Sequence, residues 1–225
     1  MIFDGQVIAQ KFFSAENSSS YDTVVKYTTF GNDSMWKRQI VKNINKNHKN
    51  ILDLACGTGI LSSFIPSEDD IKIIGADLTF NYILNAKKRR KYSLLSNSVA
   101  EFLPFKSMSF DAIISSYLAK YMNIPLVVNE LWRILKNGGI VIFHDFVYPL
   151  SKFMRSIWHY YFHILNQIGR IVKSWKPVFS ALDKVIKDSK WIKDLIETLE
   201  NTGFKLVQCK YYTFTTAAII TAVKP

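Results

Sequence analysis

Short apolar runs alternate with amphipathic stretches over most of the chain. The apolar runs have the length of strands and cover residues 50–55, 71–78, 111–119 and 140–146. The stretches between them predict helices over 59–65, over a segment carrying the basic run Lys87–Lys91, and over 126–139 with Asn137, Gly138 and Gly139 as its left-handed end. Fully apolar strands that alternate with helices are typical of a parallel sheet covered on both faces. The pattern predicts an α/β fold with a doubly wound, mostly parallel sheet.

The two ends of the chain depart from this alternation. Residues 21–43 have a mixed helical pattern, and the small polar residues 14–20 (SAENSSS) predict a mobile linker before them. Residues 151–172 predict an amphipathic helix that forms a lid. Its apolar stripe consists of Ile157, Tyr161, Ile164, Leu165, Ile168, Ile171 and Val172. After a helix that closes at Gly203, residues 205–225 predict two strands that pair as an antiparallel hairpin.

Length and composition are those of one well-buried domain, because 225 residues with 48% hydrophobic content are hardly enough for two. We expect a single domain over 1–225, with an N-terminal helical segment (1–48) and a helical lid insertion (150–190). The sequence shows neither a cationic and apolar leader nor an apolar run of about 18 residues. Cys56 and Cys209 lie far apart without a CxxC or Cys/His companion, which predicts a reduced, cytoplasmic location and no structural zinc.

A glycine pair follows the first apolar run, in the stretch NILDLACGTGILSSF (residues 50–64). Gly57 and Gly59 predict a tight turn that lets the backbone approach a ligand beyond the strand. Asp53 brings a carboxylate near that ligand, and Ser62 stands where dinucleotide-binding turns have a third glycine. A carboxylate is a poor neighbour for a pyrophosphate and a good one for the cationic groups of S-adenosylmethionine. Asp77, after the second run, suits the ribose diol of either ligand.

Several stretches resemble the motifs of class I S-adenosylmethionine-dependent methyltransferases, namely LDLACGTG, GADL, AEFLPFKSMSFDAIISSYL and ELWRILKNGGIVIF. Three others, YDTVVKYTTFGNDSMWKRQIV, WHYYFHILNQIGRIV and YYTFTTAAIITAVKP, are similar to segments of the ubiquinone/menaquinone biosynthesis C-methyltransferases. The resemblance covers the chain from about residue 13 to 225. It implies a Rossmann-like, seven-stranded sheet, S-adenosyl-L-methionine as cofactor, and methyl transfer to a hydrophobic, prenylated quinol.

The resemblance also implies roles for individual residues. The cofactor-binding set it predicts is Asp53, Ala55, Cys56, Gly57, Thr58, Gly59, Asp77, Leu78, Val99, Ala100 and Ser115. In that set the glycine turn and Thr58 hold the methionine part, and Val99 and Ala100 flank the adenine. The chain departs from the family at Val99, where Asp or Asn is usual, and at Val25. It also has Ala119 and Lys120 in place of an Arg-Asn pair that faces the substrate in the family.

Methylation of a hydroquinone ring carbon benefits from a group that removes the phenolic proton. Tyr21 and Asp145 are the first candidates for this base, and His144 is a third. Lys120 would instead stabilise the phenolate, in place of the family's arginine. Two other classes stay open: a methyltransferase for another small molecule, a lipid or RNA, and a non-catalytic S-adenosylmethionine-binding protein.

The net charge of +11 suits an anionic partner, and for a lipid acceptor it predicts peripheral contact with an anionic membrane. Nucleic acid is disfavoured, because SSYLAK lacks the Asn-Pro-Pro-Tyr type of motif and no RNA-binding module is visible. The basic run Lys87–Lys91 is interpreted as a solvated helix end. His159 and His163 lack an acidic companion for a metal site. The aromatic residues of the 150s are either ordinary core or the wall of a lipid-tail pocket.

Overall fold

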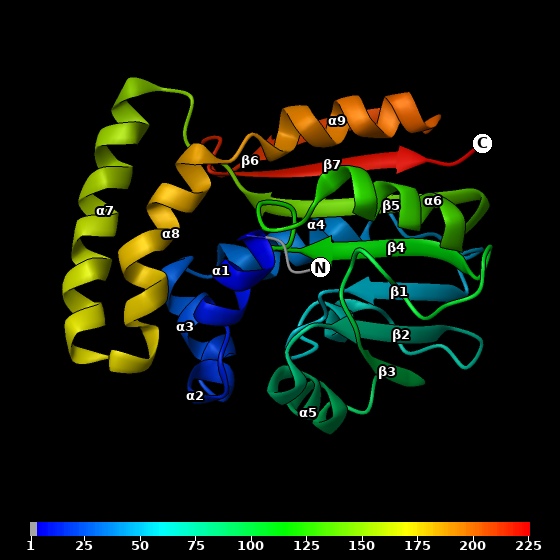
Figure 1. The fold of residues 1–225 in the computed structure, drawn as a ribbon, viewed down its shortest axis with the longest axis horizontal. Coiled ribbons are helices and arrows are strands. Elements are labelled where there is room, and N and C mark those ends of the chain that lie inside the picture. The colour runs from blue at the N-terminus through cyan, green and yellow to red at the C-terminus, as the bar shows by residue number, and fades with distance from the viewer. Residues whose placement is uncertain (1–3) are drawn as a thin grey trace.

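The computed structural model describes residues 4–225 and contains a mixed sheet in which seven strands lie in the order β3-β2-β1-β4-β5-β7-β6 (Figure 1). The strands are β1 (Asn50–Leu54), β2 (Lys72–Asp77), β3 (Leu94–Asn97), β4 (Phe110–Ser116), β5 (Leu135–Phe146), β6 (Lys205–Tyr212) and β7 (Ala217–Val223). Strands β1 to β5 pair in parallel, whereas β7 is antiparallel to both β5 and β6. The predicted doubly wound α/β fold with a C-terminal antiparallel hairpin is therefore confirmed.

Helices surround this sheet on both faces and at one end (Figure 1). They are α1 (Asp4–Phe12), α2 (Ala15–Ser18), α3 (Tyr21–Thr28), α4 (Asn32–Val41), α5 (Phe80–Lys88), α6 (Ile124–Ile134), α7 (Lys152–Ile171), α8 (Lys176–Asp188) and α9 (Trp191–Thr202), with 3-10 turns at Ser62–Phe64 and Lys173–Trp175. Among residues 4–225, no helix combines the length and apolarity that a bilayer-spanning helix needs.

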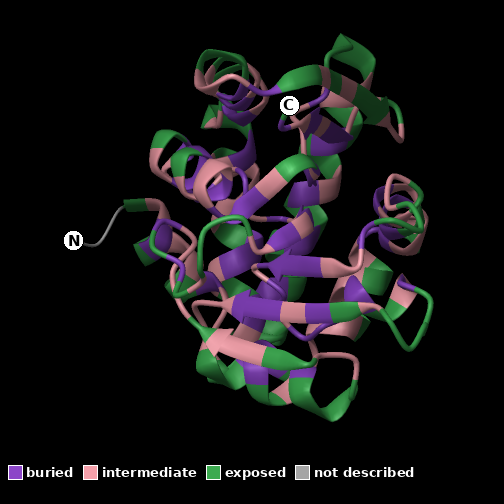
Figure 2. Ribbon diagram, turned by 90° about the vertical axis from the view of Figure 1, so that its right-hand side faces the viewer, coloured by how far each residue is buried: buried purple, intermediate pink, exposed green. Residues whose placement is uncertain are grey.

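Two hydrophobic cores lie on opposite faces of the sheet. On one face α6 and α9 cover side chains such as Leu52 and Phe143, and on the other α4 covers Ile51 and Ile142. Successive side chains of a strand point to opposite faces, so each central strand contributes to both cores. Buried residues accordingly gather on the central strands, while the edge strands β3 and β6 carry exposed ones (Figure 2).

A separate core holds α7 and α8 together beside the end of the sheet (Figure 1). Its buried residues are Phe12 of α1, Trp158, Phe162 and Leu165 of α7, Trp175, Val178, Phe179 and Ile186 around α8, and Tyr121. Only some residues of the apolar stripe predicted for residues 151–172 are buried, since Ile171 is 83% exposed and Ile157 is 45% exposed. The buried side of α7 follows Trp158, Phe162, Leu165 and Gly169 instead. A Cβ at Gly169 would lie 3.3 Å from Phe179 Cβ, so a residue without a side chain allows the close contact with α8.

Three local predictions were wrong. Residues 14–20 are not a mobile linker, because α2 forms there and buried Asn17 donates a 2.6 Å hydrogen bond to Phe12 O. The helix predicted over 59–65 is reduced to the 3-10 turn Ser62–Phe64 before Pro66. The helix predicted over 126–139 ends at Ile134, and Leu135 already pairs with Phe110 as part of β5.

Candidate active site

The glycine turn after β1 has the left-handed backbone that its sequence predicts. Gly57 has a φ of 55° and Gly59 a φ of 78°, and Ala55 joins them with a φ of 57°. The Gly57 amide donates to Asp77 Oδ2 at 2.8 Å, and the Thr79 amide donates to Asp77 Oδ1 at 2.8 Å. The carboxylate at the end of β2 therefore ties the turn after β1 to the turn after β2.

Asp53 lies buried behind this turn. Ser62 Oγ and Tyr92 Oη both donate to its Oδ2, at 2.6 and 2.7 Å, whereas its Oδ1 has no hydrogen-bond partner within residues 4–225. Burial raises the pKa of Asp53 to about 6. The Tyr92 ring fills the space above two glycines, because a Cβ at Gly59 or at Gly75 would come within 2.9 Å of it.

The N-terminal helices close over the glycine turn. Thr58 Oγ1 donates a 2.5 Å hydrogen bond to Asp22 Oδ1, and Arg89 forms an ion pair with the same carboxylate. Arg89 Nε also donates to Thr58 O at 2.7 Å. Arg89 thus belongs to a structural contact, although the basic run Lys87–Lys91 was interpreted as solvated. We call Asp22, Thr58 and Arg89 the turn clasp.

A small pocket of about 100 Å³ lies at the C-terminal edge of β1 and β2. Of the cofactor-binding residues predicted from the sequence, those that line it are Ala55, Gly57, Asp77, Leu78, Val99 and Ala100. The others, Asp53, Cys56, Thr58, Gly59 and Ser115, are not among its lining residues. The buried Ser115 hydroxyl donates to Leu54 O at 2.7 Å, and the next residue, Ser116, lines the pocket.

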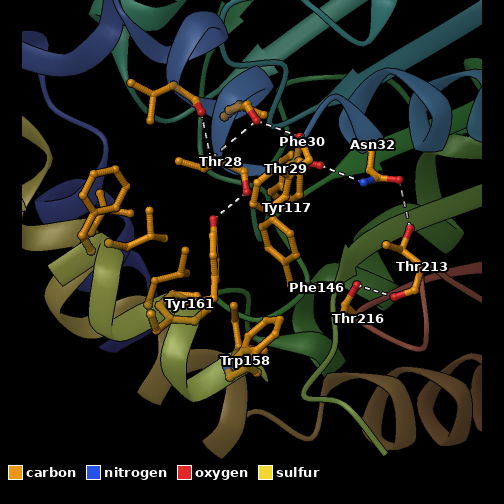
Figure 3. A pocket seen from close by; sticks show the side chains of 18 of the residues that line it. Thr28, Thr29, Phe30, Asn32, Tyr117, Phe146, Trp158, Tyr161, Thr213 and Thr216 are labelled. Carbon is orange, nitrogen blue, oxygen red and sulfur yellow. Dashed lines mark hydrogen bonds between the residues drawn. The ribbon is translucent and has the colours of Figure 1, made fainter. Parts of the chain in front are cut away.

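A larger cavity of about 420 Å³ lies beside the first, enclosed mainly by α3, α7 and α8 (Figure 3). Its walls are almost wholly apolar or aromatic, with Trp158, Tyr161 and Phe146 among them. Tyr161 Oη donates to Thr28 O at 2.5 Å and so joins α7 to the end of α3. Val25, one of the departures from the family pattern, also lines this cavity, as does Lys120.

Four aromatic side chains line both pockets: Phe13, Tyr21, Tyr117 and Tyr121. The Tyr121 hydroxyl is buried and has no hydrogen-bond partner within residues 4–225. The Tyr117 hydroxyl donates to Asp33 Oδ1 at 2.8 Å, and Asp33 in turn forms a buried ion pair with Lys37. The two pockets thus share a border of aromatic rings, and the Tyr121 hydroxyl at this border has no partner among the described residues.

Lys120 and Asp145 form a buried ion pair beside these rings. Lys120 Nζ lies 2.5 Å from Asp145 Oδ1 and 4.5 Å from the centre of the Tyr121 ring. Burial lowers the pKa of Lys120, and the carboxylate of Asp145 opposes that shift. Asp145 also accepts the amide hydrogen of Phe146 at 2.7 Å, so its position is fixed from two sides. Lys120 lines the large cavity, while Asp145 stands behind it.

His144 lies outside both pockets. Its Nδ1 is 2.9 Å from Ser116 Oγ, its ring packs against Trp36, and its Nε2 has no partner within the described part of the chain. Burial lowers the pKa of His144 well below its usual range, and the nearby Lys37 and Lys120 add to the shift. The imidazole is therefore neutral and faces the interior.

A model of the ubiE/COQ5 methyltransferase family matches residues 4–224. The chain belongs to the ubiE/COQ5 methyltransferase family. It is 30% identical to the demethylmenaquinone methyltransferase of Oceanobacillus iheyensis, with 89% of each protein covered. It is 29% identical to the ubiquinone/menaquinone biosynthesis C-methyltransferase UbiE of Blochmanniella floridana, over 92% of this chain and 86% of that protein.

The solved structures agree on the fold of this methyltransferase. Haemonchus contortus phosphoethanolamine N-methyltransferase 2 in complex with S-adenosyl-L-methionine superposes with a TM-score of 0.67, covering 100% of this chain and 60% of that longer one. At 15% identity this likeness concerns the fold alone. Together with the family match it makes the chain an S-adenosylmethionine-dependent methyltransferase with a Rossmann-like fold.

Several site residues of the methyltransferase had not been singled out from the sequence. Tyr117 and Tyr121 stand on either side of Lys120 just after β4, and this spacing after a strand end is the signal that marks them. Tyr92 and Asp22 carry no such signal, because each acts on a residue more than 30 positions away. Within residues 4–225 there is no group of three or more His, Cys, Asp or Glu side chains that could hold a metal ion.

Proposed function

We propose that this methyltransferase methylates a ring carbon of a hydrophobic, prenylated quinol. The observation that carries the proposal is the apolar cavity of about 420 Å³ that adjoins the smaller pocket through four shared aromatic side chains. A quinol ring fits between aromatic side chains, and a prenyl tail fits apolar walls. The relatives, a demethylmenaquinone methyltransferase among them, support the same class of acceptor.

We assign the smaller pocket to S-adenosylmethionine. Asp53 lies behind the glycine turn and outside the lining of this pocket, and its Oδ1, which has no partner among the described residues, would attract the methionine ammonium across the turn. The backbone of the Gly57–Gly59 turn would hold the rest of the methionine part, and Asp77 the ribose. Leu78, Val99 and Ala100 would flank the adenine. In this assignment Thr58 holds the cofactor through its backbone, since its hydroxyl already donates a hydrogen bond to Asp22.

When bound, S-adenosylmethionine supplies an electrophilic methyl group on a positively charged sulfur. The quinol hydroxyl loses its proton to solvent before the ring is enclosed, so that electron density reaches the neighbouring ring carbon. Held in the smaller pocket, S-adenosylmethionine would supply its methyl group to that carbon and would keep the electron pair of the broken carbon–sulfur bond. The ring carbon then releases its hydrogen as a proton and the aromatic ring forms again. The residues contribute by aligning the ring and excluding water.

Lys120 stabilises the phenolate in this proposal. Lys120 lines the large cavity, and its buried ammonium lies close to the rings of Tyr117, Tyr121 and Phe146, where a positive charge in a poorly solvated site favours an oxyanion. Asp145 positions Lys120 through their 2.5 Å contact. Burial raises the pKa of Tyr21 and of Tyr121 well above the usual range, so both phenols stay protonated and are able to donate hydrogen bonds to the acceptor oxygen.

The test is methyl transfer to a defined acceptor. Purified protein is incubated with methyl-labelled S-adenosylmethionine and a short-tailed demethylated naphthoquinone, either oxidised or reduced with dithionite, and the product is identified by mass. We expect label on the ring carbon only with the reduced quinone. A quinone already methylated at that carbon is the control. Binding of S-adenosylmethionine without label in either quinone or quinol would refute the proposed acceptor and favour another small molecule, lipid or RNA.

A further inference from the structure

Helix α7 carries a row of apolar side chains that faces solvent along its whole length. The row consists of Phe153, Ile157, Tyr160, Ile164, Ile168 and Ile171, each exposed. Their spacing of three and four residues keeps them on one side of the helix. The residues that pack against α8, such as Trp158 and Leu165, occupy a different side. We call this row the α7 stripe.

The stripe is continuous with the rim of the larger cavity, which the proposed function assigns to the acceptor and which we call the acceptor cavity. Ile157, Tyr160 and Ile164 belong to the stripe and also line the cavity. Phe30 and Phe214 line the same cavity and are 80% and 77% exposed. The cavity therefore opens among side chains that water solvates poorly, and α7 lies at the outer end of the molecule, away from the sheet (Figure 1).

The charged residues of α7 itself are all basic, and Asp183 of α8 bonds to Trp158 on the side of α7 that packs against α8. Residues 146–182 contain no Asp or Glu, and their Lys and Arg residues are Lys152, Arg155, Arg170, Lys173 and Lys176. A helix with one apolar side and a basic polar side is typical of segments that lie in the plane of a membrane interface. A second copy of this chain is a poorer occupant, because two such basic faces, each on a chain of net charge +11, would repel each other.

We propose that the α7 stripe docks onto an anionic lipid bilayer, with the mouth of the cavity turned toward the lipid. The apolar side chains enter the boundary between headgroups and acyl chains, and Lys152, Arg170 and Lys173 contact the anionic headgroups. A hydrophobic acceptor then passes from the bilayer into the cavity without crossing water. Vesicle binding needs no turnover, so its outcome does not depend on which acceptor is methylated.

The experiment is co-sedimentation with vesicles of phosphatidylglycerol and phosphatidylcholine in equal parts, compared with phosphatidylcholine alone. We expect binding to the anionic vesicles that weakens with salt. The triple variant Phe153→Asp, Tyr160→Asp and Ile171→Asp should lose about 100-fold or more in affinity, because it removes three anchors and adds three negative charges. The matched control Leu84→Asp, Leu94→Asp and Leu206→Asp changes the charge equally at exposed residues outside the stripe and should lose about tenfold at most.

A second variant tests the charges and leaves the apolar residues in place. Lys152→Gln, Arg170→Gln and Lys173→Gln should weaken binding to anionic vesicles about 100-fold, at roughly 1 kcal/mol for each basic residue. Binding of S-adenosylmethionine, measured in the same samples, should not change. Absence of vesicle binding by the unmodified protein would overturn the proposal. So would equal losses in the stripe variant and its control, or a dimer in solution that only the stripe variant abolishes.

Discussion

The pocket beside the glycine turn and the apolar cavity next to it differ in how their walls are held. Around the turn, polar side chains fix the backbone: Asp77 accepts the Gly57 amide, and Asp22 accepts the Thr58 hydroxyl. Around the cavity, rings pack against rings, as Trp158 does with Phe162, and few hydrogen bonds cross the space. Directional bonds hold a ligand with fixed polar groups in one pose, whereas apolar packing accepts a tail of variable shape. We therefore propose that the polar pocket would fix the pose of the cofactor and the apolar cavity would supply affinity for the acceptor.

Substitutions at the Lys120–Asp145 ion pair should have the largest effects, because these two charged side chains are buried beside the apolar cavity. Lys120→Met should cost about 3 to 5 kcal/mol of unfolding free energy, since it leaves the Asp145 carboxylate buried and unpaired. It should also abolish methyl transfer. Urea unfolding and the transfer assay measure the two effects.

The double variant Lys120→Met with Asp145→Leu separates stability from chemistry. Replacing both partners by apolar residues should restore most of the lost stability, because no uncompensated charge remains. Methyl transfer should stay absent. Full activity in the double variant would show that the ion pair has only a structural role.

Substitutions in the glycine turn test the role of the smaller pocket. Gly57→Val places a branched side chain at a φ of 55° beside the cofactor and should lower the affinity for S-adenosylmethionine about 100-fold. Gly138→Val imposes the same kind of strain at a φ of 76°, in a place where a Cβ meets no atom within 4 Å, and should leave the affinity unchanged. Calorimetric titration measures both, and equal losses would point to general destabilisation instead of a local effect.

Asp53 and Asp77 predict opposite pH dependences for stability and for cofactor binding. Burial raises the pKa of each to about 6 from a usual 3.8, so the folded protein binds protons more tightly than the unfolded chain does. The protonated carboxyl groups of Asp53 and Asp77 therefore make their full contribution to the free energy of unfolding below pH 4. This contribution is lost as the pH rises through about 6. For Asp53 the loss is on the order of 3 kcal/mol.

Cofactor affinity should change the other way, because the methionine ammonium favours the ionised form of Asp53. We expect the affinity to fall as the pH drops below about 6, while the cofactor-free protein becomes more stable to urea. Asp53→Asn should flatten the affinity profile and make the stability profile shallower, since Asp77 still titrates near 6. Profiles that remain as steep in the Asn variant would contradict the role of Asp53.

The smallest effects concern the two tyrosines after β4. Tyr121→Phe removes a hydroxyl that has no hydrogen-bond partner within residues 4–225, so stability should not fall, whereas methyl transfer should slow about tenfold if that hydroxyl contacts the acceptor. Tyr117→Phe removes the hydrogen bond to Asp33 and should cost about 1 kcal/mol of unfolding free energy. Thermal unfolding and the rate of transfer distinguish the pair. An unchanged rate of methyl transfer in Tyr121→Phe would show that this hydroxyl does not contact the acceptor.

The sequence was informative where the structure depends on neighbours along the chain. The run from Asp53 to Gly59 contains the strand end and the turn together, so its conformation could be predicted. The end of α6 could not, because Leu135 leaves the helix to pair with Phe110 of β4, which the local Asn-Gly-Gly signal does not reveal. Strand β3 was also missed, since its four residues carry no apolar pattern.

The candidate site shows the same division. Lys120 and Asp145 were both named from the sequence, but in separate roles, and their ion pair across 25 positions became visible only in the fold. The family resemblance implied a pocket position for Ser115, whereas in the structure its hydroxyl bonds to Leu54 O and Ser116 lines the pocket. The burial of the Tyr121 hydroxyl depends on helices far away in the chain, and no local pattern predicts it.

Helix α3 takes part in both halves of the site. Asp22 near its start belongs to the turn clasp, while Val25 and Thr28 further along line the acceptor cavity. A rotation or displacement of this one helix would change the access to both ligands together. Exchange of the spent cofactor and entry of the next acceptor would then share a single rate-limiting motion, and a variant that loosens the clasp would accelerate both steps or neither.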